Sequence, residues 1–406
     1  MTGTAQDLPA YPYPRGHSSG CPFSLPPELE SLRQQGPIAR VRIWNGMTAW
    51  LVTGFREQRA LLADPRFSAD DTTPGYPIQS PAFNARRRSL RTFVTMDDPE
   101  HARYRRMISG WFTIKQTEAM RPKIQNIVDS LIDDMLDKGS PADLVSAFAQ
   151  PVPSLVTCEM LGLPYEDHTF LEEKIRTYVA RTTSAEDAMA SVDALGDYLG
   201  RAVRAKAENP GDDLLSKLVA EHVHPGYLSL DECTAMASLL LEGGFDTTAN
   251  MITLGTLALL QHPGQLAELR ASDDPKLLAN AVEELLRYIN VAHYGRRRVA
   301  LEDVTIAGQA IRAGEAVICS NDAGNRDPQE FPDPEELDIH RDVRRHLGFS
   351  YGTHQCIGQP LARVELQVVY GTLYRRIPTL RLNADPVSLP FLDGIVYSVL
   401  SLPVAW

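Results

Sequence analysis

The chain has 406 residues, 43% of them hydrophobic, so it can bury a large core. Its formal net charge of −12 argues against a nucleic-acid-binding protein. Its five scattered cysteines argue against a disulfide scaffold and fit a reducing cytoplasm.

The first twenty residues are polar and rich in proline and glycine, and they lack the apolar core of a signal peptide. We expect residues 1–20 to be a flexible N-terminus. No run of 18 apolar residues occurs anywhere, which predicts a cytoplasmic protein with no membrane contact. No Ser/Gly-rich or charge-block linker divides the chain, so we expect one domain over 1–406, present as a monomer.

Strand and loop signals come first along the chain. Residues 38–53 are predicted to form a β-hairpin, with a type I′ turn at Asn45-Gly46. Residues 70–94 contain several prolines and a run of arginines, and we expect an irregular loop there.

Helical patterns dominate the middle of the chain. They run from about Pro99 to Leu240, with breaks predicted at the Gly- and Pro-containing segments 139–141, 162–164 and 209–211. Residues 230–262 are the longest helical candidate, because a capping box opens them and His262-Pro263-Gly264 ends them.

A further helix is predicted over 275–290 and short strands over 304–306, 316–319 and 380–405. The sequence therefore predicts a mainly α protein with small β-sheets.

Two adjacent glycines interrupt the long helix near its centre. Gly243 and Gly244 each cost about 1 kcal/mol relative to alanine there, so they indicate a close approach to the backbone or a local opening. Asp246 and Thr247 follow and would place an acid and a hydroxyl at the same opening. A packing notch with solvent-facing polar residues is the alternative.

Cys356 lies in the segment Phe349-Ser350-Tyr351-Gly352-Thr353-His354-Gln355-Cys356-Ile357-Gly358. It stands just before a helix that Gln359 and Pro360 are predicted to begin. Free backbone N–H groups at a helix start favour a thiolate over a thiol. A cysteine of this kind could be a nucleophile, a redox sensor or a metal ligand.

The pattern Phe-x-x-Gly-x-His-x-Cys-x-Gly-x-x-Leu-Ala-Arg resembles the haem-binding signature of the cytochrome P450 family, although Ser350 stands where the family usually has glycine. The resemblance implies a long central helix over a haem b group whose axial iron ligand is Cys356. It implies that Thr247 stabilises bound O2, the co-substrate, and that Asp246 delivers protons from solvent.

The resemblance also assigns structural and cofactor-binding residues. Glu284 and Arg287 would form a buried ion-pair network with a third partner after the next loop, for which Arg326 and Arg341 are candidates and Arg341 is favoured. The residues expected to hold the haem propionates are His101, Arg105, Arg298 and His354.

We expect a monooxygenase that hydroxylates or epoxidises a medium-sized, mainly apolar molecule such as a polyketide, terpenoid or steroid. The residues expected to line the substrate pocket are Leu239, Gly243, Phe245, His293, Tyr294, Ile395 and Val396. A relative that uses peroxide or reduces nitric oxide, and a non-catalytic haem sensor, are the alternatives.

Electrons are expected from a ferredoxin and its NAD(P)H-dependent reductase, because the chain has neither a flavin domain nor a cysteine cluster. The arginines expected at the docking face are Arg103, Arg106, Arg344 and Arg345.

Overall fold

The computed structural model describes residues 8–11, 21–86, 91–180, 183–392, 394 and 396–406. The α-helices within these residues are α1 (Pro27–Gln35), α2 (Phe55–Ala63), α3 (Pro81–Arg86), α4 (Glu100–Ser109), α5 (Ile114–Ala119), α6 (Arg121–Lys138), α7 (Pro151–Leu161), α8 (His168–Val179), α9 (Ala185–Glu208), α10 (Leu214–Leu218), α11 (Leu230–Gln261), α12 (Pro263–Ala271), α13 (Pro275–Ile289), α14 (Asn321–Gly324) and α15 (Gln359–Arg376). The chain is therefore mainly helical, and no helix among the described residues is long and apolar enough to cross a membrane.

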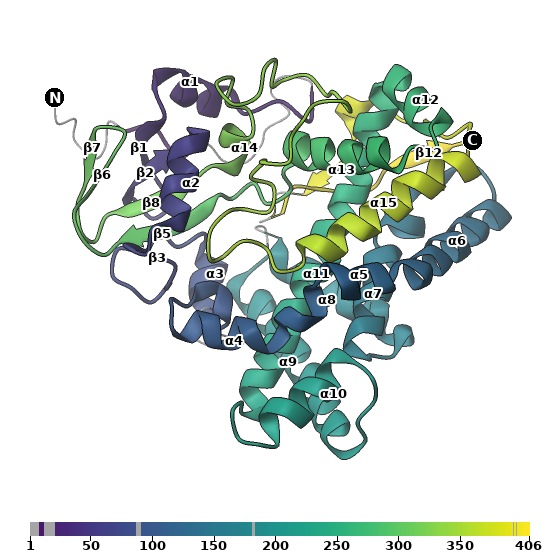
Figure 1. Cartoon of the computed structure of the whole chain (residues 1–406), viewed down its shortest axis with the longest axis horizontal. Helices are drawn as coiled ribbons and strands as arrows, with labels where there is room; N and C mark the ends of the chain where they lie inside the picture. Colours follow the sequence, from purple (N-terminus) through teal and green to yellow (C-terminus); the bar gives the residue numbers. More distant parts are fainter. Residues whose placement is uncertain (1–7, 12–20, 87–90, 181–182, 393, 395) are drawn as a thin grey trace.

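Among the described residues, the strands form four small sheets. They are β1 (Ile38–Arg42), β2 (Thr48–Val52), β3 (Phe67–Ser68), β4 (Ala142–Asp143), β5 (Arg296–Ala300), β6 (Val304–Ile306), β7 (Gln309–Ile311), β8 (Ala316–Cys319), β9 (Arg381–Leu382), β10 (Phe391–Leu392), β11 (Ser398–Val399) and β12 (Pro403–Ala405). The largest sheet has the order β1-β2-β8-β5-β3, and β2 and β8 are parallel within it. Figure 1 shows this sheet at one side of the molecule and the long helices gathered on the other side.

The predicted hairpin is present, but its turn differs from the prediction. Strands β1 and β2 pair antiparallel, from Ile38 opposite Val52 to Arg42 opposite Thr48. A type I′ turn needs positive φ at both central residues, whereas of Asn45 and Gly46 only Gly46 has positive φ, 84°. Backbone hydrogen bonds from Ile43 N to Met47 O and from Gly46 N to Ile43 O instead close a loop one residue longer. The type I′ prediction was therefore wrong.

The predicted loop over 70–94 is also only partly irregular, because α3 occupies its middle. The predicted helix breaks are confirmed, since α6, α7 and α9 end at Lys138, Leu161 and Glu208.

Helix α11 is the central element, and it has the start that the sequence predicts. The hydroxyl of Ser229 accepts a hydrogen bond from Glu232 N at 3.1 Å, and the Glu232 carboxylate accepts one from Ser229 N at 2.7 Å. At about 1.5 Å per residue, its 32 residues span roughly 48 Å. Every residue from Thr248 to Leu259 is buried, so this half of the helix is enclosed by protein.

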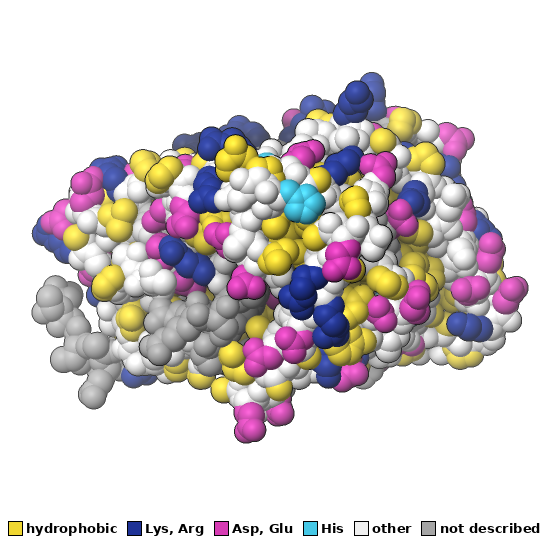
Figure 2. Space-filling model, turned by 90° about the horizontal axis from the view of Figure 1, so that it is seen from below, with side chains coloured by type: hydrophobic (Ala, Val, Ile, Leu, Met, Phe, Trp, Pro, Cys, Tyr) yellow, Lys and Arg dark blue, Asp and Glu magenta, His cyan; other side chains and the backbone are white. Residues whose placement is uncertain are grey.

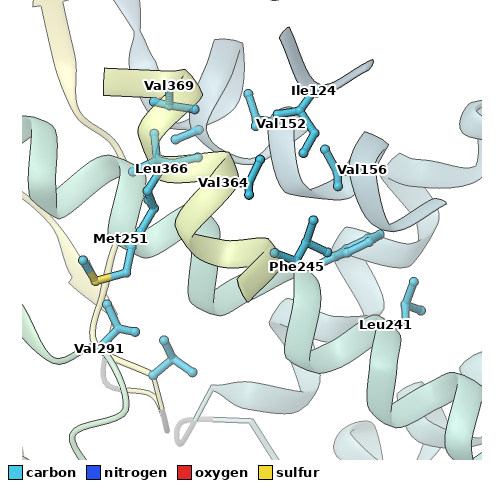
Figure 3. Packing of buried hydrophobic residues seen from close by; sticks show 14 of the residues in the cluster. Ile124, Val152, Val156, Leu241, Phe245, Met251, Val291, Val364, Leu366 and Val369 are labelled. Atoms are coloured by element: carbon cyan, nitrogen blue, oxygen red, sulfur yellow. The ribbon is translucent and has the colours of Figure 1, made fainter. Parts of the chain in front are cut away.

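The main hydrophobic core lies around α11 and is built with α6, α7, α13 and α15. Figure 3 shows side chains of these helices meeting there, among them Val152, Val156, Phe245 and Val364. The face shown in Figure 2 carries interspersed acidic and basic side chains and no large patch of one sign.

Candidate active site

The loop before α15 holds Cys356 in a tight, backbone-defined shape. The Cys356 N–H donates to Phe349 O at 2.9 Å, and the Gln355 N–H donates to Gly352 O at 3.0 Å. Gly352 has a φ of 77°, and a Cβ there would lie 2.1 Å from Leu62 O on α2. Only glycine fits this position.

Ser350 also has positive φ, 63°, although it is not a glycine. Left-handed backbone costs a residue with a side chain about 1–2 kcal/mol, so the loop keeps its shape here at some cost in stability. The Ser350 N–H still closes the turn to Leu347 O at 2.8 Å. The replacement of glycine by Ser350 therefore leaves the turn in place.

Two opposing effects act on the Cys356 thiol. Burial raises its pKa above the ordinary value. The pKa of the thiol is lowered by the backbone N–H groups at the helix start, those of Gly358 and Gln359. The cations of Arg296 and Arg105 lower it as well. The helix start thus acts in the expected direction, toward the thiolate, but the effect of burial outweighs it in the protein alone. A bound metal ion would be needed to reverse the balance.

A cavity of about 310 Å³ opens between Cys356 and α11. Most of its walls are apolar, from residues such as Phe93, Phe112, Leu240 and Phe349. Gly243 lines it, and a Cβ on this residue would meet no atom within 4 Å. Gly244 is different, because a Cβ there would lie 2.5 Å from Thr157 Oγ1 on α7. Both glycines line the cavity, and Gly244 also allows α11 to pack closely on α7.

Asp246 and Thr247 face different cavities, which corrects the expectation of a shared opening. Thr247 lines the cavity at Cys356, and its hydroxyl donates to Gly243 O at 2.7 Å. Asp246 lines a separate cavity of about 50 Å³ together with Glu172, Arg176 and Asn250. Successive residues of a helix are rotated by about 100°, so neighbours in sequence point to different sides.

The carboxyl group of Asp246 is buried and only partly satisfied. The Asn250 amide donates to Asp246 Oδ1 at 2.9 Å, while Oδ2 has no hydrogen-bond partner among the described residues. Burial raises the pKa of Asp246 to about 6, and the Asn250 hydrogen bond opposes this effect. The group can therefore take up and release a proton near neutral pH.

Basic side chains gather at one rim of the Cys356 cavity. The rings of His101 and His354 stack with centroids 4.1 Å apart, and Arg105 donates to Gln355 O at 2.6 Å. Burial, together with the nearby charges of Arg298, His101 and Arg105, lowers the pKa of His354 to about 3. The four predicted propionate ligands therefore lie close together.

Arg296 is an additional rim residue that is not among the four predicted propionate ligands. It lines the cavity, and its Nε is buried without a hydrogen-bond partner among the described residues. It lies two residues before Arg298 on β5, so both side chains point to the same face of the sheet. This alternation in a buried strand was the signal that could have identified it.

These features fit a haem group. His101 Nε2 and Arg296 Nε are buried nitrogens without partners among the described residues, and the N–H of Arg296 Nε is a donor of the kind that a propionate would accept from. The wide apolar cavity, the missing side chain at Gly243 and the thiol at the opposite wall suit a flat macrocycle with an axial sulfur ligand.

The predicted substrate-pocket residues divide into two groups. Leu239 and Gly243 line the Cys356 cavity. Phe245 does not, because it is buried in the main core and lines the small cavity of Asp246 instead (Figure 3). His293 contacts Gly394 O at 3.0 Å, and its ring lies against Tyr397.

Tyr294 and Val396 are buried outside the Cys356 cavity as well. Phe245, His293, Tyr294 and Val396 therefore do not line the Cys356 cavity, and Ile395 lies outside the described residues. Val291 and Ala292, just before His293, line the cavity in their place.

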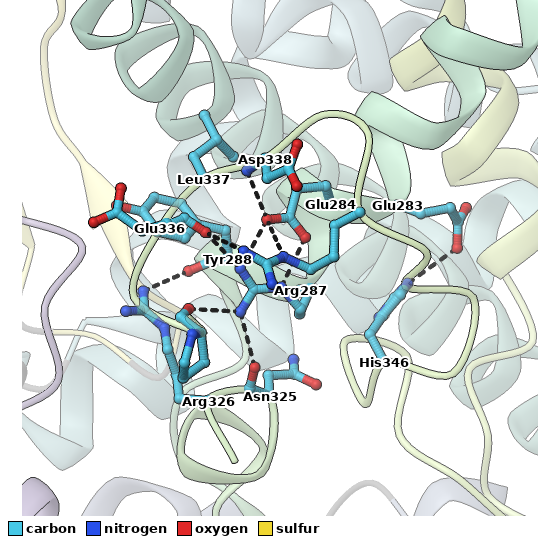
Figure 4. Close-up of polar contacts among 12 residues, drawn as sticks. Glu283, Glu284, Arg287, Tyr288, Asn325, Arg326, Glu336, Leu337, Asp338 and His346 are labelled. Atoms are coloured by element: carbon cyan, nitrogen blue, oxygen red, sulfur yellow. Dashed lines mark hydrogen bonds and ion pairs between the residues drawn. The ribbon is translucent and has the colours of Figure 1, made fainter. Parts of the chain in front are cut away.

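Glu284 and Arg287 on α13 form a fully buried ion pair (Figure 4). Arg287 Nε and Nη2 donate to the two carboxylate oxygens of Glu284 at 2.7 and 2.8 Å. Arg341 Nε contacts Glu284 Oε1 at 3.3 Å, whereas Arg326 donates to the backbone oxygens of Phe23 and Tyr288. Arg341 is thus the third partner of this network.

Comparison with known proteins relates this site to characterised families. The family model described as "Cytochrome P450" matches residues 197–379. Cytochrome P450 GfsF from Streptomyces halstedii is 49% identical over 99% of this chain and 97% of its own length. Pentalenic acid synthase from Streptomyces avermitilis is 45% identical over 100% of this chain and 99% of its own. The crystal structure of mycinamicin VIII C21 methyl hydroxylase MycCI from Micromonospora griseorubida, bound to mycinamicin VIII, superposes with a TM-score of 0.92 at 37% identity, covering 98% of this chain and 100% of the other.

Proposed function

Because this chain belongs to the cytochrome P450 family, we propose that it inserts one oxygen atom from O2 into a C–H bond of a medium-sized, mainly apolar molecule. The family uses haem and O2, and its members are oxidoreductases. The observation that carries the proposal is the position of Cys356, whose thiol faces a wide apolar cavity from the start of α15. Haem b, when bound there, would supply the O2 activation and the oxygen transfer.

On the side of α15, the protein would hold the sulfur in place. The Cys356 N–H is anchored to Phe349 O, and the N–H groups of Gly358 and Gln359 act on the sulfur. His101, Arg105, Arg296, Arg298 and His354 would hold the propionates.

On the side of α11, Thr247 and Asp246 would take part in proton transfer. The Thr247 hydroxyl already donates to Gly243 O, so its oxygen is oriented to accept a further hydrogen bond within the cavity. Asp246 would collect protons from the small polar cavity that Glu172 and Arg176 also line. A turn of the Asp246 side chain would then bring the proton toward Thr247.

The substrate class is inferred from the cavity walls and from relatives. Leu239, Met160, Val94 and Ala292 give the cavity an apolar lining. Relatives carry the names pentalenic acid synthase and mycinamicin VIII C21 methyl hydroxylase. We therefore infer a polyketide, terpenoid or steroid as the substrate, hydroxylated or epoxidised as a step of secondary metabolism.

We further infer that a ferredoxin, re-reduced by an NAD(P)H-dependent reductase, supplies the electrons. Arg106, Arg344 and Arg345 are exposed near the elements that carry Cys356 and would meet an acidic carrier. Arg103 is less suited, because its guanidinium donates to Tyr227 O. We also infer that the chain acts as a single-domain monomer in the cytoplasm.

The test is spectroscopic. The reduced, CO-bound protein should show the red-shifted Soret band of thiolate ligation, and Cys356→Ser should abolish it. A library of polyketides, terpenoids and steroids is then titrated while the spin state of the iron is followed. An unchanged band in Cys356→Ser would overturn the assignment of the ligand.

A further inference from the structure

A buried histidine, His346, lies at the base of the loop that carries Cys356. Its Nε2 is 3.0 Å from Glu283 Oε2 on α13, and its side chain is only 1% exposed (Figure 4). Its Nδ1 accepts a hydrogen bond from the backbone N–H of Gly348 at 2.9 Å. The imidazole therefore joins a helix to the loop backbone.

These two contacts fix the form of the ring. A backbone N–H can only donate, so Nδ1 must present its lone pair to Gly348. Nε2 must then carry the hydrogen, which it donates to the Glu283 carboxylate. His346 is thus held as a neutral imidazole, with one nitrogen accepting and the other donating.

Glu283 connects the two arms of this network, which are the side chains of His346 and Arg363. Arg363 on α15 donates to both carboxylate oxygens of Glu283, at 2.6 and 2.9 Å. Burial raises the pKa of Glu283, but the hydrogen bonds of His346 and Arg363 outweigh it and hold the pKa at about 2. Glu283 is therefore charged across the working range of pH and can bind both partners at once.

Both arms end at Phe349. The Arg363 guanidinium lies over the Phe349 ring, 4.6 Å from its centroid, and the His346 ring lies 5.9 Å from it, centroid to centroid. Phe349 O is the acceptor of the Cys356 N–H. Gly348 packs so closely on α13 that a Cβ would lie 2.7 Å from Leu286 O. The backbone from Gly348 to Phe349 is thus held by three contacts: the side chain of His346, the side chain of Arg363 and the backbone of α13.

We propose that His346 is a positioning residue for Cys356, acting through Gly348 and Phe349, with Glu283 and Arg363 as its support. None of these side chains touches the sulfur. They fix the acceptor of the Cys356 N–H, and hence the place of the thiolate below the haem. This inference rests on the proposed role of Cys356 as axial ligand.

The chain offers matched variants that separate the two contacts. His346→Gln keeps an amide donor for Glu283 and loses the acceptor for Gly348, and His346→Asn does the reverse. His346→Leu loses both. The control is His340→Gln, because His340 and Glu268 form a His–Glu pair at 2.9 Å, against 3.0 Å for His346 and Glu283, on the surface at 58% and 50% exposure.

The purified haem-loaded chain is measured as the reduced CO complex, and the ratio of the red-shifted to the unshifted Soret band is recorded. Hydrogen exchange of the peptide over 346–358 is measured alongside. We expect His346→Leu to lower the ratio about tenfold and to speed exchange, with Gln and Asn each restoring part of the loss. His340→Gln should leave both readouts at the wild-type value.

A merely structural role would lower the temperature of unfolding without changing the band ratio of the folded protein, and this result would overturn the proposal. An equal fall of the Soret band ratio in His346→Leu and His340→Gln would overturn the proposal too. If His346→Leu does not fold, Arg363→Met removes the second arm, and an unchanged ratio in that variant is contrary to the proposal. A wild-type spectrum that lacks the red-shifted band would refute the ligand assignment itself.

Discussion

Asp246 and Thr247 are neighbours in the sequence, yet their side chains lie in two different cavities on two sides of α11. Only Thr247 faces the cavity of Cys356. The proposed function requires a proton to pass from one cavity to the other, and the helix between them is continuous. Asp246, with one oxygen unpartnered among the described residues, is the group proposed to carry it.

The first prediction concerns Asp246→Asn. The variant cannot carry a proton, so product formation should fall by about 10²–10⁴-fold, the usual contribution of a positioned acid. Because the pKa of Asp246 is about 6, the wild-type rate should decline as pH rises through that value, and the variant should lack this inflection. Rates at a saturating electron supply between pH 5 and 8 test this. Asp231→Asn, exposed near the start of α11, is the control. An inflection that persists in Asp246→Asn would assign it to another group.

Glu365 on α15 provides a prediction about stability. It lines the Cys356 cavity, Oε2 has no partner among the described residues, and burial raises its pKa to about 8 from 4.5. The folded state therefore prefers the protonated acid. The contribution of Glu365 to the unfolding free energy is fully present below pH 4.5 and is lost as pH rises through 8.

Glu365→Gln should remove this loss. Relative to wild type, the variant should gain roughly 2–5 kcal/mol of unfolding free energy between pH 5 and pH 9. Urea unfolding at both pH values measures the change, with the exposed Glu221→Gln as control. If the difference in unfolding free energy between wild type and Glu365→Gln stays constant over this range, the pKa of Glu365 is not raised in the folded protein.

The Glu284–Arg287 pair predicts a large effect from losing one partner. Arg287→Met leaves the carboxylate of Glu284 buried without its main partner, which should cost about 3–5 kcal/mol. Arg287→Lys keeps the charge but cannot bond both oxygens and should be intermediate. Arg341→Met should cost less, because Arg341 makes one longer contact to Glu284. Chemical unfolding ranks the three variants, and an Arg341→Met loss as large as that of Arg287→Met would contradict this order.

Local patterns in the sequence sufficed for the long helix, because its capping box and its Pro-Gly stop are short-range signals. The direction of single side chains needed the structure. Phe245 and Asp246 point away from the Cys356 cavity because of helix rotation relative to neighbours far along the chain. Arg296 was missed because its burial depends on strand β8, which follows it in sequence.

A fourth prediction concerns the electron carrier. Arg344→Glu and Arg345→Glu should slow reduction by ferredoxin, and more strongly at low than at high ionic strength. Arg344→Glu should have the larger effect, because Arg345 is partly neutralised by Glu330 at 3.0 Å. Stopped-flow reduction at two salt concentrations measures both. Arg375→Glu, near the other end of α15, is the control. Equal slowing in Arg375→Glu would count against this docking face.

The two glycines of α11 give the sharpest paired prediction, because they are adjacent and differ only in what a methyl group would meet. Alanine at Gly243 meets no atom within 4 Å and improves helix propensity, so Gly243→Ala should stabilise the protein by about 1 kcal/mol. The new methyl group projects into the cavity, so substrate binding, followed by the spin-state shift, should weaken.

Gly244→Ala should do the opposite. Its methyl group would lie 2.5 Å from Thr157 Oγ1, so the variant should lose about 1–3 kcal/mol through overpacking between α11 and α7. Thr157→Ala removes Oγ1 and Cγ2 and leaves Cβ at 3.5 Å, an ordinary contact. The double variant should therefore recover stability beyond the sum of the two single changes. Additive losses would show that Thr157 is not the obstacle, and that Gly244 is required for something other than close packing.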